Sequence, residues 1–260
     1  MSRFLTLLYH RVNDALEPGE LNTPPLKFRQ QMEYLARNHE ILSGDDLSAG
    51  EEALIRVNSR SISENSRSKL KVLITFDDGY RDNYLNAYPV LREFDFPALV
   101  FLATGMVNTP KTRPRYSHLP VPDMLSWEEA REMARHGISF GAHTAGHPHL
   151  SSLNYVRQKS EISASIEALV PLVETRSRPK DDRPSVFFCY PYGDYNEETL
   201  KILRELGICF AFTTRSGLND ERTPPLELHR SWVDGRMSMD EFDAWLKHED
   251  EEQLRIKNEE

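Results

Sequence analysis

The sequence predicts an α/β fold with a mainly parallel sheet, and three observations support this. Short, nearly continuous apolar runs, typical of strands covered on both faces, recur along the chain. Segments of helical period separate them, so strands and helices alternate repeatedly. The 260 residues are enough for one large domain of this class. The pattern alone leaves open whether the sheet is open or closes into a barrel.

Each strand is predicted from an apolar run, and each helix from apolar periodicity with start or stop signals. Strands are expected at residues 4–9, 72–75, 98–102, 138–142, 186–190, 208–212 and, from a weaker pattern, 226–233. Helices are expected at residues 26–38, 81–94, 127–136, 153–173, 197–206 and 239–248. Ser126 with Glu129, and Ser238 with Glu241, match the capping-box pattern, and Asn196 is a typical N-cap.

The chain is expected to form a single domain over residues 1–248, followed by a polar, acidic tail at 249–260. Three polar or proline-containing segments are predicted to be surface loops, at 58–69, 104–125 and 175–184. No internal repeat and no strong boundary divides the rest of the sequence.

Composition limits the classes of partner. A net charge of −9 without a basic stripe disfavours nucleic acid. No run approaches the ~20 apolar residues of a transmembrane helix. The first residues lack the long apolar region and cleavage site of a secretory signal, so a cytoplasmic location is expected. The sequence does not indicate an oligomeric state.

Two adjacent carboxylates, Asp77 and Asp78, follow the apolar run that ends at Phe76. Asp and Gly are common turn residues, so an ordinary strand-to-turn transition is one interpretation. The other is functional, because parallel α/β folds place their ligands at the carboxyl ends of strands.

Two histidines four residues apart, His143 and His147, follow another apolar run. Each taken alone is more typical of a structural histidine, but the spacing is a recurrent metal-ligand arrangement if the segment makes a helical turn. Two imidazoles and one carboxylate are a usual ligand set for catalytic zinc, which activates water at neutral pH. A second carboxylate could then act as general base. The sequence therefore predicts a zinc hydrolase site in which the two aspartates have different roles.

A third segment, residues 187–196, has the same plan of apolar run, Pro/Gly turn and helix start. Its aromatic side chains, including Tyr190 and Tyr192, are suited to stacking on a sugar ring. Its turn N–H groups are suited to binding a developing oxyanion. An ordinary turn around Pro191 explains the same residues equally well.

Together these segments resemble the polysaccharide deacetylase family, also called NodB-homology or carbohydrate esterase family 4 proteins. The resemblance extends over about residues 5–233. The matching motifs are Thr75-Phe-Asp-Asp-Gly79, His143-xxx-His147-Pro148, Tyr190-Pro-Tyr-Gly193 and the opening Leu8-Tyr-His-Arg-Val12. The family's fold is a distorted (β/α) barrel with about seven parallel strands, which selects the barrel over the open sheet.

The resemblance also implies roles for individual residues. Asp77 corresponds to the family's catalytic base, and Asp78, His143 and His147 to its metal ligands, most commonly for Zn²⁺. The backbone N–H of Tyr192 corresponds to a group that helps to hold the oxyanion. The implied reaction is hydrolysis of an amide to acetate and a free amine.

The chain departs from the family pattern at two positions. Cys189 stands where many members have an arginine that tunes the base. His229, in Leu226-Glu-Leu-His229, either is the general acid or is a strand residue without catalytic duty. His10 lines or supports the pocket. The expected substrate-binding residues are His10, Tyr80, Tyr190 and Pro191.

The sequence thus predicts a metal-dependent deacetylase that removes an N-acyl, most commonly N-acetyl, group from an amino sugar. The sugar is expected in a polysaccharide, an oligosaccharide or a lipid- or nucleotide-linked precursor. Two alternatives stay open: a metal amidohydrolase acting on a cyclic ureide or imide, and a catalytically silent carbohydrate-binding protein of the same fold.

Overall fold

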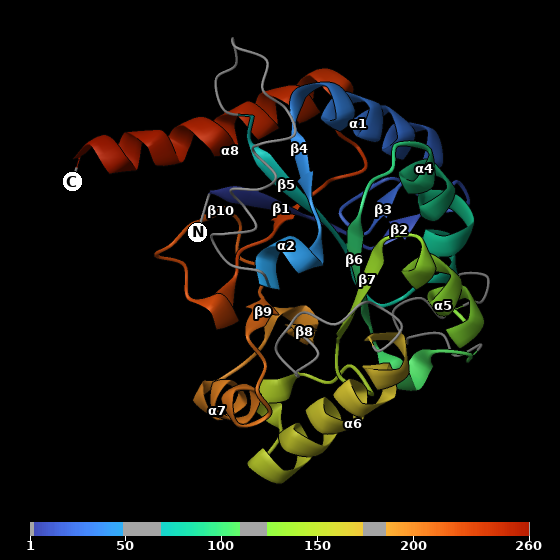
Figure 1. Ribbon diagram of the computed structural model, residues 1–260. Helices are drawn as coiled ribbons and strands as arrows, with labels where there is room; N and C mark the ends of the chain where they lie inside the picture. Colours follow the sequence, from blue (N-terminus) through green and yellow to red (C-terminus); the bar gives the residue numbers. More distant parts are fainter. Residues whose placement is uncertain (1–2, 49–68, 110–123, 174–185, 260) are drawn as a thin grey trace.

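The computed structural model describes residues 3–48, 69–109, 124–173 and 186–259 (Figure 1). The predicted loop at 175–184 lies outside the described residues, as do most of the loops predicted at 58–69 and 104–125.

The elements occur in the predicted order. The strands are β1 (Phe4–Tyr9), β2 (Arg11–Val12), β3 (Asn22–Thr23), β4 (Glu40–Leu42), β5 (Lys71–Phe76), β6 (Ala98–Leu102), β7 (Ile138–Ala142), β8 (Phe187–Cys189), β9 (Phe210–Phe212), β10 (Leu218–Asn219) and β11 (Ser231–Trp232). The helices are α1 (Pro25–Asn38), α2 (Gly44–Ser48), α4 (Tyr88–Glu93), α5 (Trp127–Arg135), α6 (Tyr155–Val173), α7 (Glu197–Glu205) and α8 (Met239–Glu259). A π-helical turn spans Asn83–Ala87, and 3₁₀ turns span Thr104–Met106, Leu150–Ser152, Pro191–Gly193 and Pro225–Glu227.

The main sheet is curled and mostly parallel, in the order β10-β1-β5-β6-β7-β8-β9, with helices outside it (Figure 1). Of these neighbours, only β10 and β1 are antiparallel. Residues 228–232 connect the two edges, because Leu228 bridges Phe212 of β9 and β11 pairs in parallel with β1. The seven parallel strands β1, β5–β9 and β11 therefore form a distorted barrel, which confirms the predicted fold class.

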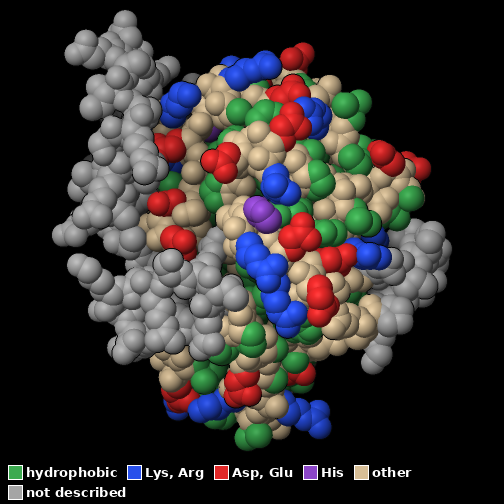
Figure 2. Space-filling view, turned by 45° about the vertical axis from the view of Figure 1, so that its right-hand side comes forward, with side chains coloured by type: hydrophobic (Ala, Val, Ile, Leu, Met, Phe, Trp, Pro, Cys, Tyr) green, Lys and Arg blue, Asp and Glu red, His purple; other side chains and the backbone are tan. Residues whose placement is uncertain are grey.

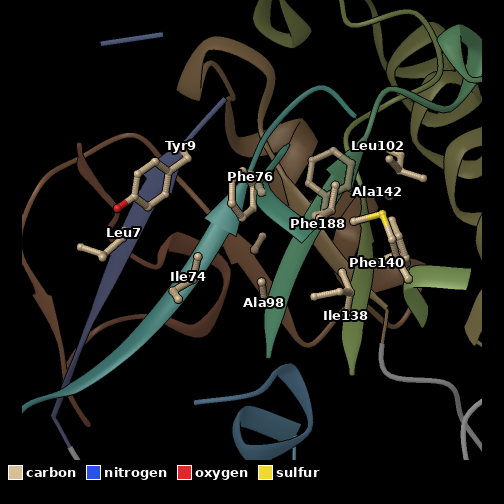
Figure 3. Packing of buried hydrophobic residues seen from close by; sticks show 14 of the residues in the cluster. Leu7, Tyr9, Ile74, Phe76, Ala98, Leu102, Ile138, Phe140, Ala142 and Phe188 are labelled. Carbon is tan, nitrogen blue, oxygen red and sulfur yellow. The ribbon is translucent and has the colours of Figure 1, made fainter. Parts of the chain in front are cut away.

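Alternate strand residues pack on opposite faces of the sheet. Figure 3 shows Leu7, Tyr9, Ile74 and Phe76 among the residues of the larger cluster, which packs towards the helices. Phe28 of α1 lies edge-on to Tyr9, with ring centroids 5.3 Å apart. A second cluster fills the barrel: Phe4, Leu42, Leu47, Leu73, Leu99, Phe101, Phe187, Cys189, Phe212 and Leu228. Both faces are apolar, which explains why the strands are nearly continuous apolar runs.

The short helix α2 closes the amino end of the barrel. Leu47 belongs to the interior cluster. Gly44 lies so close to β7 and β8 that a Cβ would be 2.9 Å from a Phe187 ring carbon and 3.0 Å from Ser139 Oγ. Side chains thus fill the amino end, and polar groups collect at the carboxyl end. The sequence did not predict α2, β2, β3, β4 and β10, which are too short to give a periodic pattern.

The predicted helix starts are present. Ser126 and Glu129 form a capping box at α5, and the Asn196 side chain caps α7. The helix predicted at 81–94 is instead partly π-helical. In that turn, Asn83 Nδ2 donates to the His10 carbonyl at 2.8 Å, and this bond ties the turn to the end of β1.

Helix α8 runs to Glu259 and continues past the predicted boundary at residue 248. Its first half packs on the body through Phe242 and Leu246, while the far end extends away from the barrel (Figure 1). The division into a domain and a tail at 249–260 stays a prediction, although most of that tail is helical.

Acidic and basic side chains alternate over the face shown in Figure 2. Exposed ion pairs such as Arg29–Glu33 and Lys247–Asp243 lie on the helices. Among the described residues, no helix has both the length and the apolar character needed to cross a bilayer.

Candidate active site

Asp77 and Asp78 lie at the carboxyl end of β5, as predicted. Asp77 continues the strand, since its N–H donates to the Tyr9 carbonyl at 3.0 Å. Asp78 has a φ of 77°, in the left-handed region, and turns the chain. Gly79 follows with a φ of 80°, and a Cβ there would lie 2.6 Å from Leu102 Cδ2. This change of backbone conformation lets the adjacent carboxylates reach different partners.

His143 and His147 meet through a tight loop after β7, not through a helical turn. Thr144 and His147 have φ values of 62° and 58°. The Thr144 hydroxyl accepts the His147 N–H at 2.9 Å and holds the loop. A non-glycine residue in this region costs on the order of 1–3 kcal/mol, and such residues cluster at ligand sites. The strained conformation of this loop therefore brings the two imidazoles together.

The candidate metal-ligand group consists of Asp78, His143 and His147. All three residues are buried, and their ligand atoms converge. Asp78 Oδ1 lies 3.5 Å from His143 Nε2 and 3.3 Å from His147 Nε2. The two Nε2 atoms are 3.1 Å apart. A tetrahedral zinc ion with N and O ligands at ~2.0–2.2 Å separates those ligands by about 3.3–3.5 Å. The spacing and the donor set therefore fit a zinc-like divalent cation.

The orientation of His143 is fixed from outside this group. Its Nδ1 lies 2.8 Å from the carbonyl oxygen of Cys189, on β8. An N–H at Nδ1 donating to that carbonyl leaves the lone pair of Nε2 directed at Asp78 and His147. Metal-bound histidines are generally held in this way.

Asp77 is paired with Arg230, a residue that the sequence analysis did not select. Arg230 Nη1 donates to Asp77 Oδ1 at 2.7 Å, and Nη2 to Oδ2 at 2.8 Å, with Arg230 0% and Asp77 3% exposed. Burial opposes ionisation of Asp77, but Arg230 and His143 outweigh it and lower the pKa of this carboxyl to about 2. Asp77 is thus an ionised carboxylate beside the metal-ligand group.

The alternation of side chains along a strand could have identified Arg230 as an inward-facing residue. In the parallel register of β11 with β1, Ser231 is opposite Leu7 and Trp232 is opposite Leu8. Leu7 packs towards the helices, so Ser231 faces outward, and Trp232 and Arg230 face the barrel interior. The apolar pattern of this strand is weak, so the alternation could not be recognised from the sequence.

His10, at the end of β1, stacks on Trp232 with ring centroids 5.0 Å apart and an interplanar angle of 11°. It is buried, and burial lowers the pKa of its imidazole to about 4, although Asp78 and Asp77 act in the opposite direction. His10 is therefore neutral at neutral pH, and its contact with substrate stays a prediction.

This burial predicts an acid-sensitive fold. Between pH 6.5 and about 4 the unfolded chain binds a proton at His10 that the folded chain does not bind. The free energy of unfolding should therefore fall by about 3 kcal/mol across this window because of His10 alone. In urea unfolding of metal-free protein, His10→Gln should remove this part of the pH dependence. The exposed-residue variant His248→Gln should retain it; equal slopes in both variants would contradict the prediction.

Tyr192 lies beside the metal-ligand group in the turn after β8. Its φ is 60°, and its ring is edge-on to His147 with centroids 4.5 Å apart. The other ring contact is a stack on His149 at 3.9 Å, and 46% of Tyr192 is exposed. The backbone N–H predicted to bind the oxyanion therefore belongs to a strained turn that packs against His147, one of the candidate metal ligands.

The other predicted substrate-binding residues have packing roles. Tyr190 is fully buried, and its hydroxyl donates to the Leu226 carbonyl at 2.7 Å. Tyr80 is buried, and Cζ of the Arg11 guanidinium lies 4.6 Å from the centroid of the Tyr80 ring. Pro191 is buried as well. Direct contact of these three residues with substrate stays a prediction.

His229 precedes the inward-facing Arg230 and is half-buried. Asn219 holds its backbone, with Oδ1 accepting the His229 N–H at 2.7 Å and Nδ2 donating to the carbonyl at 2.9 Å. Strand alternation directs the His229 side chain opposite to that of Arg230. Among the described contacts, none joins this side chain to the metal-ligand group, and its role as general acid stays a prediction.

This chain is similar to known proteins in sequence and in fold. The polysaccharide deacetylase family profile matches residues 64–211. YxkH of Bacillus subtilis (strain 168), a protein assigned to the polysaccharide deacetylases, is 31% identical over 241 residues, covering 93% of this chain and 75% of YxkH. The poly-β-1,6-N-acetyl-D-glucosamine N-deacetylase of Staphylococcus aureus (strain MRSA252) is 30% identical over 146 residues, 56% of this chain and 48% of that protein.

Solved structures share the fold over nearly the whole chain. The Streptococcus pyogenes deacetylase PplD in complex with acetate has a TM-score of 0.70 at 24% identity, covering 93% of this chain and 96% of that one. IcaB from Ammonifex degensii has a TM-score of 0.69 at 26% identity, with the same coverage of both chains. The family profile and the similarity to YxkH show that this chain belongs to the polysaccharide deacetylase family and is a deacetylase, a hydrolase.

Proposed function

We propose that this deacetylase hydrolyses the N-acetyl group of an amino sugar with the help of one divalent metal ion. The observation that carries the proposal is the convergence of Asp78, His143 and His147 within 3.1–3.5 Å of one another, with the ionised Asp77 next to them. An acetylated glucosamine polymer is the substrate named for the Staphylococcus aureus relative. It is therefore the substrate class that we propose first.

Asp78, His143 and His147 would hold the metal, which is most commonly zinc for such a set. The metal supplies Lewis-acid activation of water and polarisation of the substrate carbonyl. Other residues of the chain fix the positions of these ligands. The Cys189 carbonyl orients His143, and the Thr144 hydroxyl holds the loop that carries His147.

Asp77 acts as general base. It accepts a proton from the attacking water as oxygen bonds to the amide carbon. When the C–N bond breaks, the same carboxyl returns this proton to the leaving amine, so that acetate and a free amino sugar result. Arg230 keeps Asp77 ionised before the first transfer and holds the carboxyl in position for both transfers.

In this proposal, the turn at Pro191–Gly193 binds the developing oxyanion through the Tyr192 N–H. The exposed ring of Tyr192, stacked on His149, offers a flat aromatic surface beside the metal ligands. Such a surface suits the apolar face of a pyranose ring. The same turn thus contributes to both catalysis and sugar binding.

The test is acetate release from N-acetylglucosamine oligomers, including β-1,6-linked ones, paired with metal analysis. We expect chelation, or His147→Ala, to lower the rate by at least about 10³-fold, because Lewis-acid catalysis is worth several kcal/mol. The exposed-residue control His248→Ala should not change it.

Three outcomes would overturn the proposal. Full activity of metal-free protein would remove the metal from the mechanism. Turnover of cyclic ureides or imides, with no turnover of acetylated sugars, would replace the substrate class. Sugar binding without any hydrolysis under every metal tested would favour a silent binding protein.

A further inference from the structure

We propose that Arg230 is a positioning residue that keeps the catalytic metal away from a competing donor set. The members of that set are Asp77, His143 and Cys189, whose ligand atoms all lie within 4.8 Å of one another. The inference rests on the proposed function, because it concerns how the two adjacent aspartates receive separate roles.

The competing set is suited to zinc by its own chemistry. Thiolate, imidazole and carboxylate are all zinc ligands. Cys189 Sγ lies 3.5 Å from Asp77 Oδ2. A tetrahedral zinc ion bound to sulfur and oxygen separates these atoms by about 3.6 Å. Both sets include the His143 imidazole, so they compete for it.

Arg230 occupies the atoms that this competing set would use. Its two terminal nitrogens donate to both oxygens of Asp77, and Nη2 also lies 2.9 Å from Cys189 Sγ. A metal bound to that sulfur at ~2.3 Å would be within about 5 Å of Nη2. Two cations at that distance in a buried site repel strongly. Asp77 and Cys189 are therefore closed to a metal while the guanidinium is present.

The guanidinium is fixed independently of Asp77. Its Nε donates to the Thr213 carbonyl at 2.8 Å, and Nη1 lies 3.4 Å from Thr75 Oγ1. Its Cζ lies 5.4 Å from the centroid of the Phe101 ring, and the whole side chain is buried. Arg230 cannot move aside without breaking these contacts. Asp77 is thus reserved for proton transfer, and Asp78 is left as the metal-binding carboxylate.

Cobalt(II) is the probe, because a thiolate ligand gives it an intense charge-transfer absorption that nitrogen and oxygen ligands do not give. Metal-stripped wild type titrated with Co²⁺ should bind without this band. Arg230→Met, which removes the charge but keeps much of the volume, should show the band as Cys189 binds and releases its proton to solvent. The double variant Cys189→Ser/Arg230→Met should lose it again.

Several results would overturn the inference. One is a thiolate band in wild type, and another is a folded Arg230→Met protein with the wild-type cobalt spectrum. If Arg230→Met does not fold, Cys189→Ser in the otherwise wild-type chain gives the test. It should leave the cobalt spectrum and stoichiometry unchanged, and a changed spectrum would show that the thiol already binds metal.

The two proposals fail differently. Wild type that binds no Co²⁺ at all contradicts the metal site of the proposed function. Wild type that binds Co²⁺ through nitrogen and oxygen, together with an unaltered Arg230→Met spectrum, contradicts only the role of Arg230.

Discussion

Replacing Asp77 with Asn is expected to lower kcat for deacetylation by about 10²- to 10⁴-fold, the usual contribution of a general base. Asn has nearly the same shape but cannot take a proton from water. The metal content should stay at the wild-type level, because the proposed ligand set of Asp78, His143 and His147 does not include Asp77. Acetate release and metal analysis on the same samples would check both parts.

Asp95→Asn is the matched control, since Asp95 is exposed and its φ of 53° is one that Asn adopts readily. It should have wild-type kcat. Asp77→Asn with wild-type kcat would remove Asp77 from proton transfer, and loss of metal from that variant would instead identify Asp77 as a ligand.

The second large effect is on stability. Arg230→Met should lower the free energy of unfolding of the metal-free protein by about 3–5 kcal/mol, because it leaves the buried Asp77 carboxylate without its counter-ion. Adding Asp77→Asn to this variant should recover much of the loss, since the unpaired charge is then absent. Urea unfolding of the two single variants and the double variant measures this coupling.

Arg236→Met provides the comparison, because Arg236 pairs with Asp234 at the surface and its side chain is 67% exposed. Its unfolding midpoint should be close to that of wild type. Purely additive effects of Asp77→Asn and Arg230→Met would contradict a strong ion pair in the interior.

The fold was largely predictable because its strands are covered on both faces. The runs at 4–9, 98–102 and 138–142 match β1, β6 and β7 to the residue. The last strand was predicted only weakly, since Arg230 interrupts its apolar pattern. An arginine at an inward position is stable there only because Asp77 is opposite, and a single sequence does not show that pairing.

The candidate metal-ligand residues could be selected from the sequence because Asp78, His143 and His147 are polar residues at or shortly after the ends of apolar strands. The loop geometry could not be predicted. The spacing of His143 and His147 suggested a helical turn, whereas left-handed residues at 144 and 147 bring the imidazoles together. Tyr190 was expected at the sugar; its ring is buried, and contact with substrate stays a prediction.

The segment at 228–232, which closes the barrel, also has a consequence for the order in which the protein matures. Asp77 and Arg230 are 153 residues apart in the chain, and their contact forms only when β11 docks beside β1. Contacts of such long sequence separation carry a large loop-closure cost and form slowly. During synthesis, the ribosome therefore releases both aspartates and both histidines well before the guanidinium that neutralises Asp77. A translation product that ends before residue 228 would carry the metal ligands but lack the counter-ion of its base.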